Sequence, residues 1–191
     1  NFVLHIALPA LLFNAIASRP LTEVLNTTYM GIYLVACLAT LGVAWIWFAM
    51  TGVGPARRVI GAMGSSCPNS GFIGYPLMLL VLPDYAGQVL ALNFLVENFV
   101  LIPLLLILLE MTRPRSDHGV WPLLRGMFAS LIKRPLIIAL LLGLGVAALQ
   151  IPIPTTMTRL LQMLAGAASA PALFVIGGSL VGLPSRGNIG L

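Results

Sequence analysis

Residues 61–76 read GAMGSSCPNSGFIGYP, and they lie inside an apolar run, residues 59–82, that is long enough to cross a membrane. The stretch contains four glycines, two prolines and four small polar residues. Pro68 has no amide hydrogen, and its ring clashes with the carbonyl of Gly64; Pro76 disturbs the chain four residues before it in the same way. We therefore expect this crossing to be a helix broken at Pro68.

The rest of the chain is equally suited to a bilayer. Of its 191 residues, 59% are hydrophobic and 8% are charged, with a mean hydropathy of +1.03, whereas soluble domains carry roughly 25% charged residues. Five further apolar runs occupy residues 2–18, 29–50, 89–109, 135–153 and 160–183. Hydrocarbon offers no water to backbone groups, and the runs lack the alternation of barrel strands. They therefore predict an all-α integral membrane protein with six transmembrane helices.

Basic residues are distributed unequally between the two sides that six crossings define. One side holds Arg57, Arg58, Arg113, Arg115, Arg125, Lys133, Arg134 and Arg186, and the other holds Arg19 and Arg159. Positive residues are enriched in cytoplasmic connections, so we expect the long basic connection, residues 111–134, to be a cytoplasmic loop. This topological role accounts for the net charge of +5 without a nucleic-acid partner.

A short sequence echo relates the first and the last crossing. Residues 9–13 read PALLF, and residues 171–174 read PALF. The two crossings are five spans apart, an odd number, so copies at these positions would be inverted in the membrane, as in many carriers. The echo predicts a ten-span protein made of two five-span repeats, with one span before Asn1 and three after Leu191.

The predicted break provides a site for a small anion. Backbone groups freed inside a membrane are costly unless protein or a water-lined cavity satisfies them. The helix that resumes after the break would point its N-terminal amides, which carry a partial positive charge, towards the middle of the membrane. The candidate substrate-binding residues are Ser65, Ser66, Pro68, Asn69, Ser70 and Gly71. The alternative is a proline kink whose small residues only permit close helix packing.

A second polar group lies in the run of residues 89–109. Glu97 is the only acidic residue deep inside a predicted span, and Asn93 lies four residues earlier on the same helical face. We expect Asn93 to join the substrate site. Burial in hydrocarbon disfavours a charged carboxylate, so Glu97 is the candidate for coupling transport to H⁺, with Na⁺ as the other candidate ion. The alternative is a structural hydrogen bond between helices.

The sequence lacks the motifs of other chemistries. It has no Walker motif, no HExxH zinc signature, no GxSxG nucleophile elbow and no paired aspartates within a predicted span. We therefore expect no catalytic residue, no metal site and no cofactor. The chain is predicted not to be an enzyme.

Three segments together resemble the auxin efflux carrier family, which includes plant auxin exporters and bacterial malonate carriers. They read ALPALLF at residues 7–13, PNSGFIGYP at residues 68–76, and APALF followed by GGSL at residues 170–174 and 177–180. The resemblance implies two inverted five-span repeats whose fourth and ninth helices are broken and cross at the substrate site. Residues 1–110 would hold spans two to five, and residues 135–191 would begin the second repeat with spans six and seven. Pro68, Asn69 and Ser70 would be crossover residues.

These features lead to one functional hypothesis. The protein is expected to be a secondary active transporter, a permease or efflux carrier, of a small organic anion such as a carboxylate in the inner (cytoplasmic) membrane. Access would alternate around the broken helix, and the short connection at 111–134 favours a bacterial type of carrier. A channel, a membrane sensor that binds without transport, and an enzyme with catalytic residues elsewhere are the alternatives. The expected partners are the anion and the lipid bilayer, and homodimerisation stays open.

Overall fold

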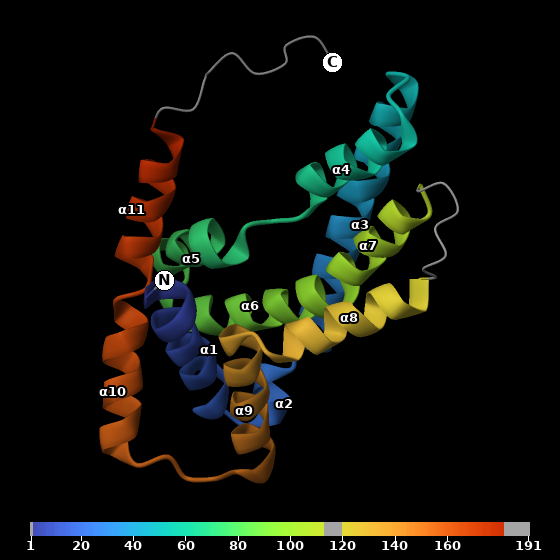
Figure 1. Cartoon of the computed structure of the whole chain (residues 1–191). Coiled ribbons are helices and arrows are strands. Elements are labelled where there is room, and N and C mark those ends of the chain that lie inside the picture. Colours follow the sequence, from blue (N-terminus) through green and yellow to red (C-terminus); the bar gives the residue numbers. More distant parts are fainter. Residues whose placement is uncertain (1, 113–119, 182–191) are drawn as a thin grey trace. The chain divides into compact units, whose positions relative to one another are not determined.

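The computed structural model describes residues 2–112 and 120–181, and every regular element within them is a helix. The chain gathers into two compact units, whose helices are labelled in Figure 1. Unit 1 comprises Asn1–Val24, Asn69–Ala91 and Pro135–Leu191, and unit 2 comprises Leu25–Pro68 and Leu92–Arg134. One boundary between the units falls directly after Pro68, where the sequence predicts the break.

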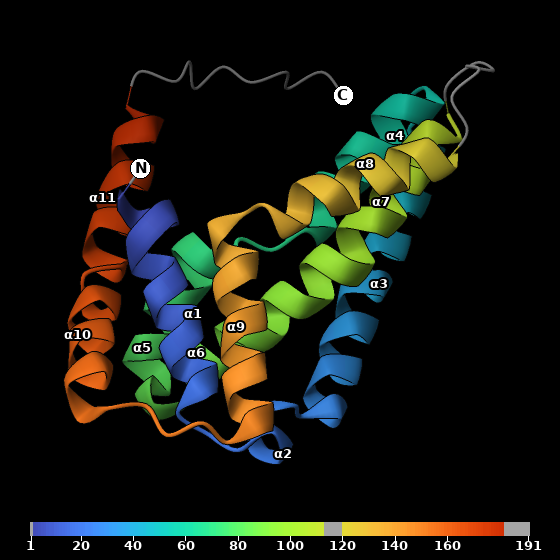
Figure 2. The same cartoon turned by 60° about the horizontal axis from the view of Figure 1, so that its bottom comes forward.

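Helix α1 is the centre of unit 1. The elements of this unit, with η marking a π-helical segment, are η1 (Val3–Ala7), α1 (Leu8–Ala17), α2 (Leu21–Val24), η2 (Ser70–Gly74), α5 (Tyr75–Val81), most of α6 (Pro83–Val96), α9 (Pro135–Leu149), α10 (Thr155–Gly166) and α11 (Ser169–Leu180). Helix α1 packs against both α9 and α10 (Figure 2). Leu8, Leu12 and Ile16 recur every fourth residue on one face of α1, and each is at most 1% exposed. This periodic apolar face forms the core of the unit.

The contact between α1 and α9 depends on a glycine. A Cβ atom added at Gly143 would lie 3.2 Å from the main-chain oxygen of Phe13 and 3.3 Å from Cβ of Ile16. Both atoms are fixed to the backbone of α1, so they cannot rotate away as the end of a long side chain would. Small residues let helix backbones approach closely in membrane proteins, and Gly143 has this role here.

We expect Gly143→Ala to lower the free energy of unfolding of the full-length protein by about 1–3 kcal/mol, because the added methyl group overpacks this contact. Gly145→Ala is the matched control on the same helix, since its Cβ would meet nothing within 4 Å and alanine favours a helix over glycine. Thermal unfolding in detergent, followed by circular dichroism, measures both variants. Equal melting temperatures would contradict the close approach of the two helices.

Unit 2 is organised along α3, its longest helix. The elements of this unit are α3 (Thr27–Met50), α4 (Pro55–Ser66), the end of α6, η3 (Glu97–Leu101), α7 (Ile102–Glu110) and α8 (Val120–Ile132). Asn26 caps α3, because its side chain accepts a hydrogen bond from an amide in the first turn. Leu41 and Ala44 of α3, Ala62 of α4 and Leu105 of α7 form a buried cluster that joins the three helices.

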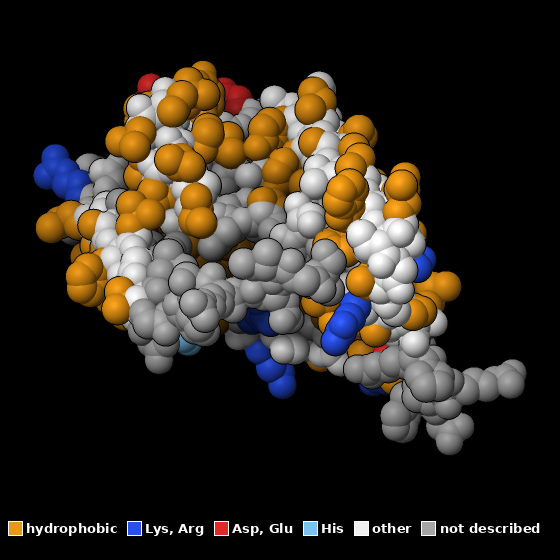
Figure 3. All heavy atoms as spheres, turned by 90° about the horizontal axis from the view of Figure 1, so that it is seen from above, with side chains coloured by type: hydrophobic (Ala, Val, Ile, Leu, Met, Phe, Trp, Pro, Cys, Tyr) orange, Lys and Arg blue, Asp and Glu red, His pale blue; other side chains and the backbone are white. Residues whose placement is uncertain are grey.

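The outward faces of the helices are largely apolar, and Figure 3 shows hydrophobic side chains over much of the surface in view. Along α3, the side chains of Ile32, Val35, Val43, Ile46 and Trp47 are between 60% and 70% exposed. An apolar surface of this extent is disfavoured in water and is suited to contact with lipid. The structure therefore agrees with a protein embedded in a membrane.

Two helical stretches of the described residues are long and apolar enough to cross a bilayer. They are Leu21–Met50 and Pro83–Glu110, and a third crossing results if Trp121–Ile132 and Pro135–Leu149 count as one broken span. The N-terminal helix Val3–Ala17 is apolar but shorter. The all-helical membrane fold is thus confirmed in its coarse form, whereas the six crossings and the ten-span inverted repeat stay predictions.

The predicted loop at residues 111–134 needs a correction, because helix α8 occupies Val120–Ile132. Apolar residues recur along α8 at helical spacing, and the ring of Phe128 packs against Phe99, with 6.3 Å between the ring centroids. This packing gives the segment a helix-stabilising partner that its basic composition does not reveal. Arg113, Arg115 and Arg186, which contribute to the predicted topology, lie outside the described residues.

The last predicted crossing, residues 160–183, is also corrected. Helices α10 and α11 replace the single helix, and they are separated by Ala167 and Ala168. Pro171 explains the interruption, because it offers no amide hydrogen to the carbonyl of Ala167 and its ring clashes with that carbonyl. Residues 182 and 183 of the predicted crossing lie outside the described part of the chain.

Candidate functional site

The helix break at Pro68 is present in the structure. Helix α4 ends at Ser66, and its final hydrogen bond runs from the amide of Cys67 to the carbonyl of Met63, at 2.9 Å. Cys67 is extended, with φ −87° and ψ 106°, and Asn69 has φ −95° and ψ 69°. Regular helical structure resumes at Ser70. Residues 67–69 therefore interrupt the helical structure between α4 and η2, as the missing amide hydrogen of Pro68 predicts.

Asn69 organises the helix that follows the break. Its side-chain Oδ1 accepts a hydrogen bond from the amide of Phe72 at 3.2 Å, and its main-chain oxygen accepts from the amides of Ile73 and Gly74 at 3.1 and 3.0 Å. Asn69 is thus the N-cap of the new helix. The side chain is exposed, and its two amide hydrogens make no hydrogen bond within the described residues.

The disturbance expected at Pro76 is present, and it is milder than a break. The chain before the proline forms the π-helical segment η2, in which the amide of Tyr75 donates to the carbonyl of Ser70. Pro76 then lies in the first turn of α5, where a missing amide hydrogen is tolerated. The extra residue in the π-helical turn keeps the chain helical up to the proline.

Two of the three serines predicted to bind substrate are hydrogen-bonded within their own helix. The hydroxyl of Ser65 donates to the carbonyl of Gly61 at 3.0 Å, and that of Ser66 donates to the carbonyl of Ala62 at 2.8 Å. Each can still accept a hydrogen bond, but neither offers its proton to a ligand in this conformation. Among the remaining predicted residues, Ser70 and Gly71 are buried, whereas Pro68 is exposed.

Asn93 and Glu97 face helix α3, and each meets a tyrosine of that helix. The hydroxyl of Tyr29 donates to Oδ1 of Asn93 at 2.9 Å, and the hydroxyl of Tyr33 donates to Oε1 of Glu97 at 2.6 Å. The tyrosine rings stack with their centroids 6.1 Å apart. We call these four residues the tyrosine ladder, because the two hydrogen bonds lie one helical turn apart.

The tyrosine ladder belongs to unit 2, whereas Asn69, Ser70 and Gly71 belong to unit 1. The structure therefore confirms that Asn93 and Glu97 share a helical face, but their association with Asn69 in one substrate site stays a prediction. The π-helical segment η3 begins at Glu97 itself. Such segments occur often at functional sites because they re-aim side chains within a helix.

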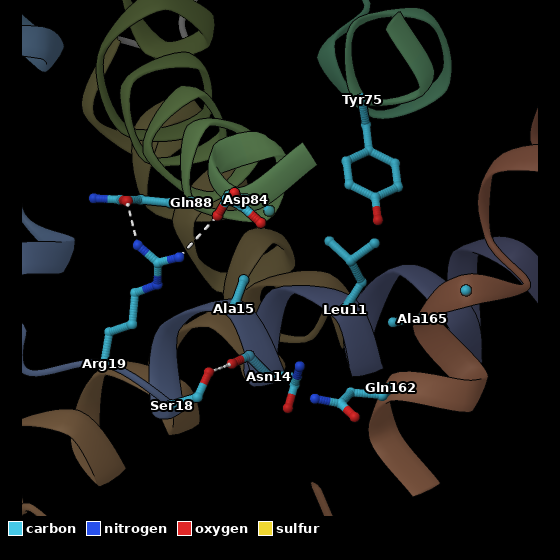
Figure 4. A pocket seen from close by; sticks show the side chains of 12 residues that line it. Leu11, Asn14, Ala15, Ser18, Arg19, Tyr75, Asp84, Gln88, Gln162 and Ala165 are labelled. Carbon is cyan, nitrogen blue, oxygen red and sulfur yellow. Dashed lines mark hydrogen bonds between the residues drawn. The ribbon is translucent and has the colours of Figure 1, made fainter. Parts of the chain in front are cut away.

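A polar cavity of about 320 Å³ lies within unit 1, between α1, α5, α6 and α10. Its polar lining comes from Asn14, Ser18, Arg19, Tyr75, Asp84, Gln88 and Gln162. Figure 4 shows the amides of Asn14 and Gln162 turned towards each other and the hydroxyl of Tyr75 directed towards α1. We call this space the α1 cavity.

Arg19 is held at the α1 cavity by three contacts. Its Nη2 donates to the main-chain oxygen of Asp84 at 2.8 Å, and its Nη1 donates to Oε1 of Gln88 at 3.4 Å (Figure 4). The guanidinium also lies 5.8 Å from the centre of the Tyr85 ring. Gln88 is itself anchored, because its Nε2 donates to the carbonyl of Glu23 at 2.6 Å.

The α1 cavity was not predicted from the sequence. Arg19 was considered only for the membrane topology, and the predicted site residues do not include Asn14, Tyr75, Asp84, Gln88 or Gln162. One signal was available, because polar residues inside apolar helices are costly and tend to face protein or water. That signal does not say which helices meet, and the cavity is built from four separate segments. Within the described residues, no group of three or more His, Cys, Asp or Glu side chains could hold a metal ion.

The family of the chain follows from comparison with known proteins. The model of a family described as "Membrane transport protein" matches residues 1–191. The chain belongs to this family. The predicted resemblance to the auxin efflux carriers is confirmed, and the family is one of transporters and not of enzymes.

One relative of this membrane transport protein is the "Putative malonate transporter" of Rhizobium meliloti (strain 1021). The two sequences are 25% identical over 197 residues, which cover 97% of this chain and 58% of the relative. The chain thus spans less than two thirds of the length of that relative.

Proposed function

We propose that this membrane transport protein is a secondary active transporter of a small organic anion such as a carboxylate, with access alternating around residues 67–69. The observation that carries the proposal is the interruption itself. A membrane-spanning chain keeps such a gap in its main-chain hydrogen bonds only where protein or a water-lined space satisfies the freed groups. The name of the relative from Rhizobium meliloti, a malonate transporter, supports a carboxylate as the substrate.

The chemistry of the break favours an anion over a cation. Helical residues 70–81 begin there, and the first amides of a helix carry a partial positive charge. Asn69 adds two amide hydrogens that the described residues leave available. Residues 61–76 contain no acidic side chain that would repel a carboxylate. Half-helices that point their N-termini at an anionic substrate recur in transporters.

Glu97 supplies the coupling step in this proposal. A carboxyl group inside a membrane is costly when it is charged. Binding of a proton to Glu97 therefore favours the transport step, and the transport step favours the bound proton. The hydroxyl of Tyr33 holds the carboxyl group in place through the 2.6 Å hydrogen bond. We assign H⁺ as the coupling ion, and Na⁺ is the competing assignment that experiment decides.

The proposal includes a topology for the chain. Residues 1–110 would complete the first five-span repeat, residues 135–191 would begin the second, and the basic segment at 111–134 would be cytoplasmic in the inner membrane. Arg57, Arg58, Arg125, Lys133 and Arg134, which the structure describes, support this orientation because positive residues are enriched on the cytoplasmic side. The proposed mechanism does not depend on dimerisation.

Transport by the reconstituted full-length protein tests the proposed function. Liposomes are supplied with labelled acetate, lactate, malonate or succinate, which we call the carboxylate panel, under an imposed H⁺ or Na⁺ gradient. A carrier gives saturable uptake of at least one compound, and unlabelled substrate on the other side accelerates exchange. Flux that rises in proportion to concentration, with conductance in planar bilayers, would indicate a channel instead. Binding of a panel member without flux would indicate a sensor.

A further inference from the structure

The α1 cavity has polar groups that the protein itself does not satisfy. Oδ1 of Asn14 is buried and has no hydrogen-bond partner among the described residues. The side chain of Tyr75 is only 7% exposed, yet within the described part of the chain its hydroxyl has no hydrogen-bond partner either. A buried polar atom without a partner is unfavourable, and more so in a membrane protein. The buried oxygen of Asn14 and the other polar groups around a space of about 320 Å³ suit a small polar ligand.

The cavity also contains a positioned positive charge. Arg19 uses two of its donors on Asp84 and Gln88, and these bonds hold the guanidinium at the cavity. Its remaining donors are available, and no carboxylate forms an ion pair with Arg19 in the described ranges. The planar guanidinium matches a carboxylate in two parallel hydrogen bonds. Such a charge-assisted pair is stronger than a hydrogen bond between neutral groups.

One acidic residue limits which anions the cavity accepts. Asp84 lines the same space, so the formal charges of Arg19 and Asp84 balance. A single carboxylate gains the attraction of Arg19, whereas a second carboxylate on the same ligand meets the negative charge of Asp84. The hydroxyl of Tyr75, Oδ1 of Asn14 and the amide of Gln162 have no hydrogen-bond partner within the described residues, and they suit a neutral polar substituent such as a hydroxyl or keto group.

We propose that the α1 cavity binds a small monocarboxylate that carries a further polar group, with its carboxylate on Arg19 and its polar group near Tyr75, Asn14 and Gln162. A cavity of this volume is at the lower end of the range for ligand sites, which fits an acid of a few carbon atoms. The biological meaning of this inference rests on the proposed transport function, since the cavity would hold the solute before or after it passes the break at residues 67–69. Binding itself is measurable without transport.

Calorimetric titration of the purified full-length protein with lactate and with succinate tests this inference. We expect lactate to bind more tightly than succinate. Arg19→Gln should weaken lactate binding by about tenfold or more, since a hydrogen-bonded charge pair is lost. Arg159→Gln is the matched control, because Arg159 is exposed on α10 and does not line the cavity, and its titration should equal that of the parent. Lactate binding that Arg19→Gln leaves unchanged would overturn the inference.

Two further variants keep the test decisive if the loss of Arg19 impairs folding. Asp84→Asn removes the repelling charge but keeps the main-chain oxygen that Arg19 contacts, so succinate should bind several-fold more tightly. Tyr75→Phe removes only a hydroxyl and should weaken lactate binding about fivefold. If neither variant changes binding, or if the parent binds no member of the carboxylate panel, the inference is wrong. Saturable transport by the same parent protein would leave the proposed function standing.

Discussion

The Asn69→Ala variant of the full-length protein is expected to lose carboxylate transport by about tenfold or more while it still folds. Alanine removes the Oδ1 that caps the amide of Phe72 and the two amide hydrogens that we assign to the substrate. Loss of a helix cap costs about 1 kcal/mol of stability, which a folded membrane protein tolerates. Loss of a hydrogen bond to a charged carboxylate costs about 1.5–3 kcal/mol, which corresponds to a tenfold or larger loss of substrate binding.

A second capping asparagine, Asn26, makes it possible to distinguish the loss of a helix cap from the loss of a substrate contact. Asn26 caps helix α3 with the same kind of bond, from the amide of Tyr29 to Oδ1 at 2.9 Å. Asn26→Ala should therefore lose a comparable amount of stability and transport at the parental rate. Uptake of the carboxylate panel in proteoliposomes, at matched protein content, gives the comparison. Equal transport by the two alanine variants would remove Asn69 from the substrate site.

The serine variant resolves the two roles of Asn69. Asn69→Ser keeps an oxygen that can cap the helix but removes the amide hydrogens. Thermal unfolding should therefore return to the parental temperature, whereas transport should stay low. Recovery of both properties would indicate that capping of the broken helix is the whole contribution of Asn69.

The break at Pro68 could be predicted from the sequence because its cause is local. A missing amide hydrogen and a ring clash act within one helical turn, whatever surrounds them. At Pro76 the same rule predicts a disturbance of the helix, and the π-helical segment η2 accommodates it without a break. The rule was not applied at Pro171, where α10 and α11 separate. Proline marks a disturbance of a helix, but packing decides whether the chain breaks or only adds a residue to a turn.

The functional residues likewise include some that a local pattern predicts and others that only tertiary packing reveals. Asn93 and Glu97 could be placed on one face because a spacing of four residues fixes their relation within a helix. Their partners Tyr29 and Tyr33 are 64 residues away in the sequence, and only the packing of α3 reveals them. Helix α8 was missed although its apolar residues recur at helical spacing, because the basic composition of residues 111–134 favoured a loop, and its contact through Phe128 with Phe99 is tertiary. No local pattern could have joined the four segments of the α1 cavity.

Glu97→Gln is expected to abolish accumulation of carboxylate driven by an H⁺ gradient, with a loss of about tenfold or more, and to retain exchange between labelled and unlabelled substrate. Glutamine has nearly the shape of the protonated acid and still accepts the hydrogen bond from Tyr33, so binding and alternating access are preserved. It cannot release a proton, so net transport no longer draws on the gradient. A ratio of accumulation to exchange equal to that of the parent would exclude Glu97 as the proton carrier.

The tyrosine ladder offers a matched pair of variants for the same question. Tyr33→Phe removes the donor to Glu97, and Tyr29→Phe removes the donor to Asn93 one turn away, with the same loss of a single hydroxyl. If Glu97 carries the proton, Tyr33→Phe should lower accumulation relative to exchange, because the carboxyl group loses the contact that positions it. Tyr29→Phe should lower both rates in proportion or neither. A ladder that served only to hold α3 against the neighbouring helix would respond equally to the two changes, so a difference between them distinguishes a coupling group from a structural hydrogen bond.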